Sequence, residues 1–327
     1  MEIETAFDKF QTAVNADPEA VAEARRRRDL FGAALGPEDD VEQTFPSGSL
    51  ARGSQIEPIH DVDYVVVYDA AAHPDWGLPG SSAEDALGYL GARVNELLGA
   101  TNGTVATEVR LASPRNHTVK CFLDDPDDPQ AFTVDATPAL RQADGTLLIP
   151  EKRSERWVPA DPQDLIRRIA ERHRNWRSFV PLVRVLKHWN RKDTAGMKSL
   201  VVEVLAYHHL PAAARSEALQ RFFTAAAFHI GTPVEDPAGL CGVIQPDLDI
   251  GHAKTCLDAA ADGAWQALAA ERRGDIDEAI CLWRSVLGGE FPEPPAGCQS
   301  GGSGSIAGPI TAPVLIRPRP VRDAPQG

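Results

Sequence analysis

The pattern of apolar and polar positions divides the chain into two halves. The first half alternates short β-branched runs with helical segments, whereas apolar residues recur every three or four positions in the second half. We expect strands at 61–69, 107–111, 118–123 and 131–135, and helices at 18–35 and 83–98. The pattern predicts an α/β first half, a short mixed sheet with helices behind it, joined to a helical second half.

Helical spacings run through the second half, which opens at Asp161-Pro162, a typical helix start. Pro181 predicts a break near Ser178, and further helices are expected from 199 and at 219–228, 253–270 and 276–287. From Pro294 the Pro, Gly and Ser content is too high for a packed element. We therefore predict a core with an N-terminal bracing helix at 1–155, a helical lobe at 156–293 and a disordered tail at 294–327.

The first candidate metal-binding residues lie at the start of the first predicted strand. Side chains alternate along a strand, so Asp61 and Asp63 share one face while Val62 points to the other. Two carboxylates within about 4 Å repel by roughly 4 kcal/mol at an effective dielectric of ~20, so a cation must offset the charge or one carboxyl must be protonated. Oxygen ligands of this kind suit Mg²⁺ or Mn²⁺.

A small-residue turn precedes these acids. Gly48 and Gly53 let backbone N–H groups approach phosphate oxygens, and Ser49 adds a hydroxyl donor. An Asp-x-Asp or a Gly-Ser turn alone is more often a solvated strand edge or an ordinary turn. Together, with an apolar strand behind the acids, they favour a site for a nucleoside triphosphate and its metal ions.

Three further residues are candidates by position. Asp135 closes a β-branched stretch and is followed by Ala-Thr-Pro, which should end the strand; taken alone, it is more often a strand-end cap than a ligand. Lys187 lies in an apolar helix, and Ser199 stands at the start of the next helix. Such residues are usually solvated or capping, but a helix N-terminus with a nearby lysine is also suited to clamp a triphosphate.

Composition narrows the choice of partners. A formal charge of −14 argues against long nucleic acid as the main partner, and the basic block Arg25–Arg28 is by default a solvated or inter-lobe face. A role for this block in binding a nucleic-acid activator is the less favoured alternative. Five scattered cysteines indicate reduced thiols, and no signal segment or membrane-length apolar run is present. We expect a cytoplasmic protein that binds no membrane.

The motifs also resemble a known family. Gly48-Ser49, Ala51-Arg52-Gly53 and Asp61-Val62-Asp63 resemble the signature of the nucleotidyltransferase superfamily that includes polymerase beta. Within it, the closest resemblance is to the bacterial cGAS/DncV-like nucleotidyltransferases, or CD-NTases, of antiphage defence. Val-Asp-x-x-Pro-Ala at Asp135 is similar to their third-acid motif. An Asp-Pro loop at 235–239 and a closing Trp…Gly…Phe-Pro motif at 283–292 extend the resemblance over residues 20–292.

This resemblance implies a polymerase-beta-like core sheet with a helical C-terminal lobe and an active site in the cleft between them. It implies two Mg²⁺ or Mn²⁺ ions, both bound by Asp61 and Asp63, with Asp135 on the ion that lowers the pKa of the attacking hydroxyl. The residues implied to bind the nucleotide are Gly48, Ser49, Arg52, Lys187 and Ser199. Leu200 stands where cyclic GMP-AMP synthase has a base-stacking aromatic residue, which leaves Tyr64 or Tyr207 as candidates for that role.

The expected activity is Mg²⁺-dependent joining of nucleoside triphosphates, ATP among them, into a cyclic di- or trinucleotide messenger with release of pyrophosphate. The messenger would reach a defence effector by diffusion. Gly327 resembles the C-terminal residue that a ubiquitin-transfer-like partner conjugates in some antiphage operons. The alternatives are linear oligoadenylate synthesis, nucleotidyl transfer to a protein, or a nucleotide-binding regulator without turnover.

Overall fold

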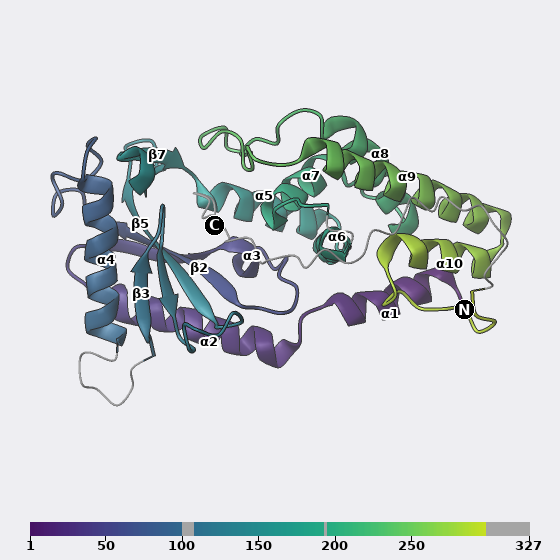
Figure 1. The fold of residues 1–327 in the computed structure, drawn as a ribbon, viewed down its shortest axis with the longest axis horizontal. Helices are drawn as coiled ribbons and strands as arrows, with labels where there is room; N and C mark the ends of the chain where they lie inside the picture. The colour runs from purple at the N-terminus through teal and green to yellow at the C-terminus, as the bar shows by residue number, and fades with distance from the viewer. Residues whose placement is uncertain (100–107, 193–194, 299–327) are drawn as a thin grey trace.

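The computed structural model describes residues 1–99, 108–192 and 195–298, and Figure 1 shows their arrangement. Within these residues a seven-stranded sheet has the order β1-β2-β5-β4-β3, and β6 joins β5 to β7. The β2 and β5 strands are parallel, and the other pairs are antiparallel. The strands are β1 (Val41–Ser47), β2 (Asp61–Tyr68), β3 (Leu111–Pro114), β4 (Val119–Phe122), β5 (Thr133–Arg141), β6 (Leu147–Glu151) and β7 (Arg156–Ala160).

Two helices cover one face of this sheet. They are α2 (Pro18–Leu35) and α4 (Ser82–Leu98), and their buried residues form one apolar cluster with Val62 and Val66 of β2. The carboxylate of Asp17 starts α2 by accepting bonds from the amides of Glu19 and Ala20 at 2.7 and 3.1 Å. The predicted bracing helix behind the sheet is therefore confirmed, and the opposite face of β2 is the one that carries Asp61 and Asp63.

The second half is helical, as predicted, and lies beside the sheet (Figure 1). Its buried side chains form a separate apolar cluster that includes Leu186, Val201 and Phe222. The α6 helix begins at Phe179, next to the expected break at Ser178, and α10 has the predicted bounds. The helices are α5 (Pro162–Asn175), α6 (Phe179–Lys192), α7 (Ser199–His209), α8 (Arg215–His229), α9 (Ile250–Arg273) and α10 (Ile276–Leu287).

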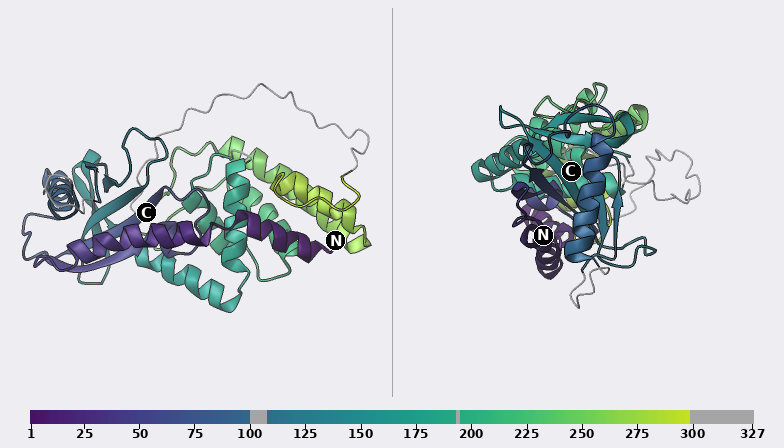
Figure 2. Two further views of the ribbon diagram at one scale, coloured as in Figure 1. Left: turned by 90° about the horizontal axis from the view of Figure 1, so that it is seen from below. Right: turned by 90° about the vertical axis from the view of Figure 1, so that its left-hand side faces the viewer.

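The first helix, α1 (Ile3–Val14), packs against this helical half instead of the sheet. Its Phe7 ring lies 5.5 Å from the Trp283 ring and 5.1 Å from the Phe291 ring, and Phe10 lies 5.2 Å from Phe291. Figure 2 shows α1 next to α10, with α2 continuing toward the sheet. The closing Phe-Pro motif thus anchors the start of the chain.

Two strand predictions were wrong. The β3 strand occupies Leu111–Pro114, whereas the expectation at 107–111 was placed too early and begins outside the described residues. The β5 strand continues through Pro138 to Arg141 instead of ending at Ala-Thr-Pro. On one flank of β5, pairing with β4 stops at Ala136 and pairing with β6 begins at Leu140. This gap accommodates a proline, which has no N–H to donate.

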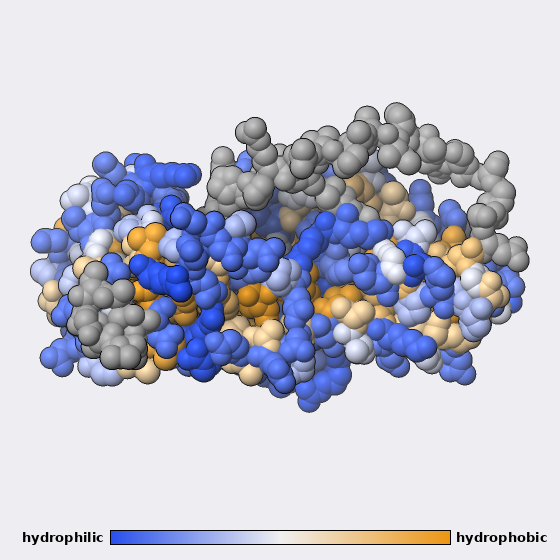
Figure 3. Space-filling model, turned by 60° about the horizontal axis from the view of Figure 1, so that its bottom comes forward, coloured by the Kyte–Doolittle hydropathy of each residue, from blue (hydrophilic) through white to orange (hydrophobic). Residues whose placement is uncertain are grey.

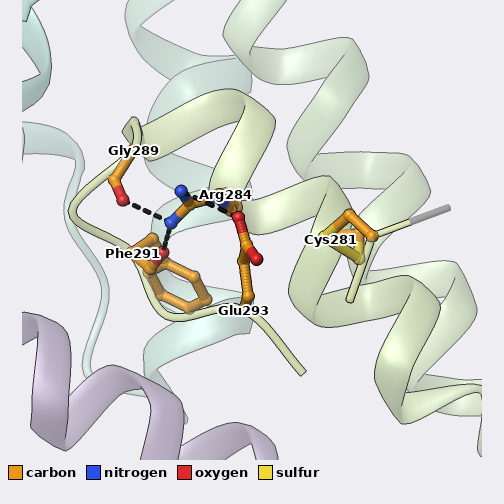
Figure 4. The surroundings of a disulfide bond; sticks show 6 residues. Cys281, Arg284, Gly289, Phe291 and Glu293 are labelled. Atoms are coloured by element: carbon orange, nitrogen blue, oxygen red, sulfur yellow. Dashed lines mark hydrogen bonds and ion pairs between the residues drawn. A yellow bond between two sulfur atoms is a disulfide. The ribbon is translucent and has the colours of Figure 1, made fainter. Parts of the chain in front are cut away.

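The expectation of reduced thiols was wrong for two cysteines, because Cys281 and Cys298 form a disulfide. The segment after α10 folds back along the helix, so residues 17 positions apart come together. Arg284 fixes this segment by donating to the carbonyls of Gly289 and Phe291 and pairing with Glu293 at 3.1 Å (Figure 4). The disulfide therefore ties Cys298, the last described residue, to α10.

Among the described helices, none is long and apolar enough to cross a bilayer. Most of the face in Figure 3 is hydrophilic, with smaller apolar areas between the polar residues.

Replacing Phe291 with alanine should lower the free energy of unfolding by about 3–5 kcal/mol, because its ring is fully buried against α1. Urea unfolding followed by circular dichroism measures the change. Phe228→Ala is the matched control, since Phe228 is 82% exposed and its loss should change stability by less than ~0.5 kcal/mol. Equal losses in the two variants would contradict this packing.

Candidate active site

The strand register brings the sequence-predicted acids into one row. Asp135 of β5 lies directly opposite Asp63 of β2 in the parallel pair, and Lys120 of β4 lies opposite Asp135. On the other side, Ser47 of β1 lies opposite Asp63. Directly paired residues share a face of the sheet, so Ser47, Asp63, Asp135 and Lys120 form a polar row across four strands. Asp61 stands at the exposed start of β2 on the same face.

Burial and charge make this row attractive to a cation. Burial raises the pKa of Asp63 to about 7, the negative charge of Asp61 adds to the shift, and Arg52 opposes it. Asp135 is only 9% exposed, and its Oδ1 lies 3.8 Å from Lys120 Nζ. The hydroxyl of Ser47 is buried and has no hydrogen-bond partner within the described residues. These oxygen donors fit Mg²⁺ or Mn²⁺.

The protein side chains alone do not form a complete metal site. Within 1–99, 108–192 and 195–298, no three His, Cys, Asp or Glu side chains gather into a ready-made metal cluster. Mg²⁺ in phosphoryl-transfer sites is typically bound by one or two carboxylates plus substrate phosphates, so a complete protein cage is not required. The arrangement suits a cation that arrives with a triphosphate.

Gly48 forms the wall beside Asp63. It has a φ of +69°, and a Cβ built on it would lie 1.6 Å from Asp63 Oδ2. The carboxylate can approach only because the residue has no side chain, and the positive φ also favours glycine. Ser49 follows in the short α3 helix (Gly48–Ala51), half-buried. The Gly-Ser turn therefore lies directly beside the Asp63 carboxylate.

A buried ion network lies behind the turn. Arg52 Nε donates to Glu203 Oε2 at 2.6 Å, and Lys187 Nζ donates to Glu203 Oε1 at 3.1 Å. The exposed fractions of these three side chains are 2% for Arg52, 4% for Lys187 and 0% for Glu203. Burial favours the neutral carboxyl, but the two cations outweigh it and lower the pKa of Glu203 to about 2. Glu203 is therefore ionised between two cations.

Sequence reasoning did not identify Glu203. It is a single acid inside the buried run Leu200–Ala206, and a lone acid among apolar helix positions was the available signal. It lies one helical turn after Ser199, on the same side of α7.

Basic residues on α6 hold the loop that follows the turn. Arg184, Lys187 and Arg191 recur at helical spacing on one face, and we call them the basic stripe. Arg184 donates to the Gly53 carbonyl at 2.9 and 2.7 Å, Lys187 to the Ser54 carbonyl at 2.9 Å, and Arg191 to the Glu57 carbonyl. The helical half thus fixes the backbone of residues 53–57.

The contacts of Lys187 in the basic stripe differ from those that the motif predicted. The motif predicted that its ammonium contacts a triphosphate, whereas here it is buried and donates to the loop and to Glu203. Ser199 is the first residue of α7 and is exposed, so it stands at a helix N-terminus as predicted. Its contact with a phosphate stays a prediction.

The two tyrosines differ in position. Tyr64 points to the opposite face of β2 from Asp63, is buried, and donates to Thr44 Oγ1 at 3.0 Å. The expectation that it stacks on a base was wrong, because alternation along the strand sends it toward α2. Tyr207 lies two turns beyond Ser199 and accepts a bond from Arg168 of α5 at 3.4 Å.

Three of the four arginines in the basic block on α2 pair with acids. Arg27 contacts Glu23 at 2.8 Å and Asp124 at 3.0 Å, and Arg26 also contacts Glu23 at 2.8 Å. Arg28 pairs with Asp29. These pairs leave less positive charge for a phosphate backbone than the sequence suggests.

The chain is similar to known proteins along most of its length. Residues 1–173 match the family model for the Second Messenger Oligonucleotide or Dinucleotide Synthetase domain. A probable cyclic nucleotide synthase of Bacillus cereus (strain VD146) is 23% identical, over 88% of this chain and 97% of its own. A cyclic AMP-AMP-AMP synthase of Acinetobacter sp. (strain ATCC 27244 / 9458) is 26% identical, over 76% of this chain and 72% of its own.

Solved structures show the same fold. CdnC of E. coli MS115-1, solved with ATP, has a TM-score of 0.64 and 19% identity, and the match covers 89% of this chain and 99% of CdnC. CdnG of Bradyrhizobium diazoefficiens, a CD-NTase solved with GTP, has a TM-score of 0.60 and 14% identity over 86% of this chain and 94% of its own.

The family model and the named relatives indicate a nucleotidyltransferase. The chain belongs to the Second Messenger Oligonucleotide or Dinucleotide Synthetase family, and it shares the fold of CdnC and of the CD-NTase CdnG.

Gly48→Ala should lower the rate of nucleotide transfer from labelled ATP at least ~100-fold, because the new methyl group displaces the Asp63 carboxylate. Gly145→Ala is the matched control, since Gly145 also has a positive φ, of +89°, but faces open space. Both variants carry a backbone strain of roughly 1–3 kcal/mol, and only Gly48→Ala alters the site. Similar rates in the two variants would refute this role of Gly48.

Glu203→Gln should lower the free energy of unfolding by about 3–5 kcal/mol near pH 7, because it leaves Arg52 and Lys187 buried without their carboxylate. The pKa of Glu203 falls from an ordinary 4.5 to about 2 on folding. Its stabilisation is therefore complete above pH 4.5 and is lost as the pH falls toward 2. The gap between wild type and variant in urea unfolding should narrow over this range.

The control for this experiment is Glu84→Gln. Glu84 pairs with Lys152 at 2.7 Å on the surface, so its loss should cost less than about 1 kcal/mol. A wild-type to Glu203→Gln gap that stays constant down to pH 2 would show that Glu203 does not act as a buried anion.

Proposed function

We propose that this enzyme joins nucleoside triphosphates into a cyclic di- or trinucleotide messenger, with Mg²⁺ bound and pyrophosphate released, in antiphage signalling. The observation that carries the proposal is the register of Asp63 with Asp135, beside Asp61 and against Gly48. Carboxylates paired across strands next to a glycine turn suit metal-assisted attack of a hydroxyl on an α-phosphate.

The carboxylates of Asp61, Asp63 and Asp135 are the groups that would hold the ions. Bound there, two Mg²⁺ ions would lower the pKa of the attacking ribose hydroxyl and neutralise charge on the triphosphate. Gly48 leaves room for the Asp63 carboxylate. Burial, together with the negative charge of Asp61, raises the pKa of Asp63, and a cation bound there would oppose this shift.

Backbone and basic groups would orient the triphosphate. The candidates are the amide of Gly48, the hydroxyl of Ser49 and the α7 N-terminus at Ser199. Arg52 adds positive charge, and its buried Nη1 has no hydrogen-bond partner within the described residues. Lys187 would act by fixing the loop at Ser54, or by turning its ammonium from Glu203 to a phosphate.

Relatives support ATP as a substrate, since one is a cyclic AMP-AMP-AMP synthase and CdnC was solved with ATP. The net charge of −14 and the paired basic block favour small substrates and short products over a long template. Conjugation of Gly327 stays a prediction, because residues 299–327 lie outside the described part of the chain.

The test is incubation of purified protein with each radiolabelled nucleoside triphosphate and Mg²⁺ or Mn²⁺, then phosphatase and chromatography. Cyclic products have no terminal phosphate, so a phosphatase-resistant product is expected. It should disappear in an Asp61→Asn, Asp63→Asn double variant and persist in Asp258→Asn, whose carboxylate pairs with Lys254 on the surface at 2.9 Å.

Other outcomes separate the alternatives. A phosphatase-sensitive ladder would indicate linear oligonucleotides, and label bound to protein would indicate nucleotidyl transfer to a protein. Activity that survives in the double variant would contradict the assignment of Asp61 and Asp63.

A further inference from the structure

Lys120 is a charged member of the polar row that neither the motif nor the comparisons single out. It lies in β4 between Val119 and Cys121, both fully buried, so its backbone position is fixed by packing on the opposite face. Its side chain is 24% exposed, and its Nζ lies 3.8 Å from Asp135 Oδ1. The strand register, not a flexible loop, therefore places this ammonium beside the third acid.

The influence of Lys120 extends beyond Asp135. Asp63 is the neighbour of Asp135 in the row, so the positive charge of Lys120 also acts on Asp63. An ordinary cross-strand pair of opposite charges contributes roughly 0.2–1 kcal/mol and needs no further role. Here, however, the acid is 9% exposed and shares its face with two more carboxylates, so the ammonium acts on the charge of the whole row.

The positive charge of Arg52 also acts on Asp63, but Arg52 makes its ion pair with Glu203 and not with an acid of the row. Its Nε is bonded to Glu203 behind the turn, and the Glu203 carboxylate cancels much of its charge. Lys187 is likewise bonded to Glu203 and to the Ser54 carbonyl. Lys120, in contrast, makes its ion pair with an acid of the row itself.

We propose that Lys120 is a positioning residue that holds the Asp135 carboxylate in the row and weakens the attraction of the row for a divalent cation. Tight metal binding then requires the negative charge of a triphosphate, so metal and nucleotide bind together. The inference rests on the proposed function, because it assumes that Asp61, Asp63 and Asp135 receive the ions.

The expected effect follows from repulsion between charges of +1 and +2. At a separation of about 6 Å in water-like surroundings, this repulsion corresponds to roughly a tenfold change in affinity. Lys120→Met should therefore bind Mn²⁺ about tenfold more tightly than wild type when no nucleotide is present. Lys120→Arg keeps the charge and should stay within about twofold of wild type.

The experiment is titration of nucleotide-free protein with Mn²⁺, with free Mn²⁺ measured by electron paramagnetic resonance. Lys152→Met is the matched control, since Lys152 pairs with the surface acid Glu84 at 2.7 Å and should leave Mn²⁺ affinity unchanged. Lys120→Gln serves as a second neutral variant if the methionine variant does not fold, as judged by circular dichroism. Unchanged or weaker binding in the folded neutral variant would overturn the role of Lys120.

An Asp63→Asn variant separates this inference from the proposed function. If wild type binds Mn²⁺ and Asp63→Asn does not, the metal site stands, and the Lys120 variants alone decide the inference. If wild type shows no Mn²⁺ binding that Asp63→Asn removes, both the metal site and the role of Lys120 fail.

Discussion

The ionised carboxylate of Glu203, buried between Arg52 and Lys187, is the interaction on which the site depends. Removing it would leave two cations in an apolar interior with no compensating charge. Arg52 follows the Gly-Ser turn and Lys187 belongs to α6, so one carboxylate joins the sheet to the helical half. The basic stripe adds bonds to the carbonyls of Gly53 and Glu57. Together these contacts set the position of the turn.

The position of the Gly-Ser turn determines where the acid side chains of the site lie. Gly48 packs directly against the Asp63 carboxylate, so a shift of the loop would displace a candidate metal ligand. The sheet positions the rest of the polar row. The register of β1, β2, β5 and β4 aligns Ser47, Asp63, Asp135 and Lys120. Backbone pairing is rigid compared with loops, and it suits a site that must hold charges a few ångströms apart.

Local patterns were enough for much of this architecture. Caps and apolar spacing identified α2, α5 and α10, and alternation placed Asp61 and Asp63 on one face. Asp135 needed the family resemblance, because its partner Asp63 is 72 residues away and no local signal encodes strand order. Lys120 was missed for the same reason. The α1 helix was missed although Ile3, Phe7, Phe10 and Val14 have helical spacing.

Other differences came from tertiary context. Pro138 marks a strand end by local rules, but a gap in pairing beside β5 admits it. Cys281 and Cys298 were interpreted as separate thiols because the return of the chain along α10 depends on Phe291 packing against α1. Glu203 violates the expectation that apolar helix positions stay apolar, and such violations often mark functional positions.

The most direct test of this account is a crystal structure of the protein with Mn²⁺ and a non-hydrolysable ATP analogue, with the ions located by anomalous scattering. We expect Mn²⁺ within coordination distance of Asp61 and Asp63, with the triphosphate against the turn at Gly48 and Ser49. Mn²⁺ and triphosphate bound elsewhere, with the polar row contacting neither, would contradict the assignment of this row as the active site.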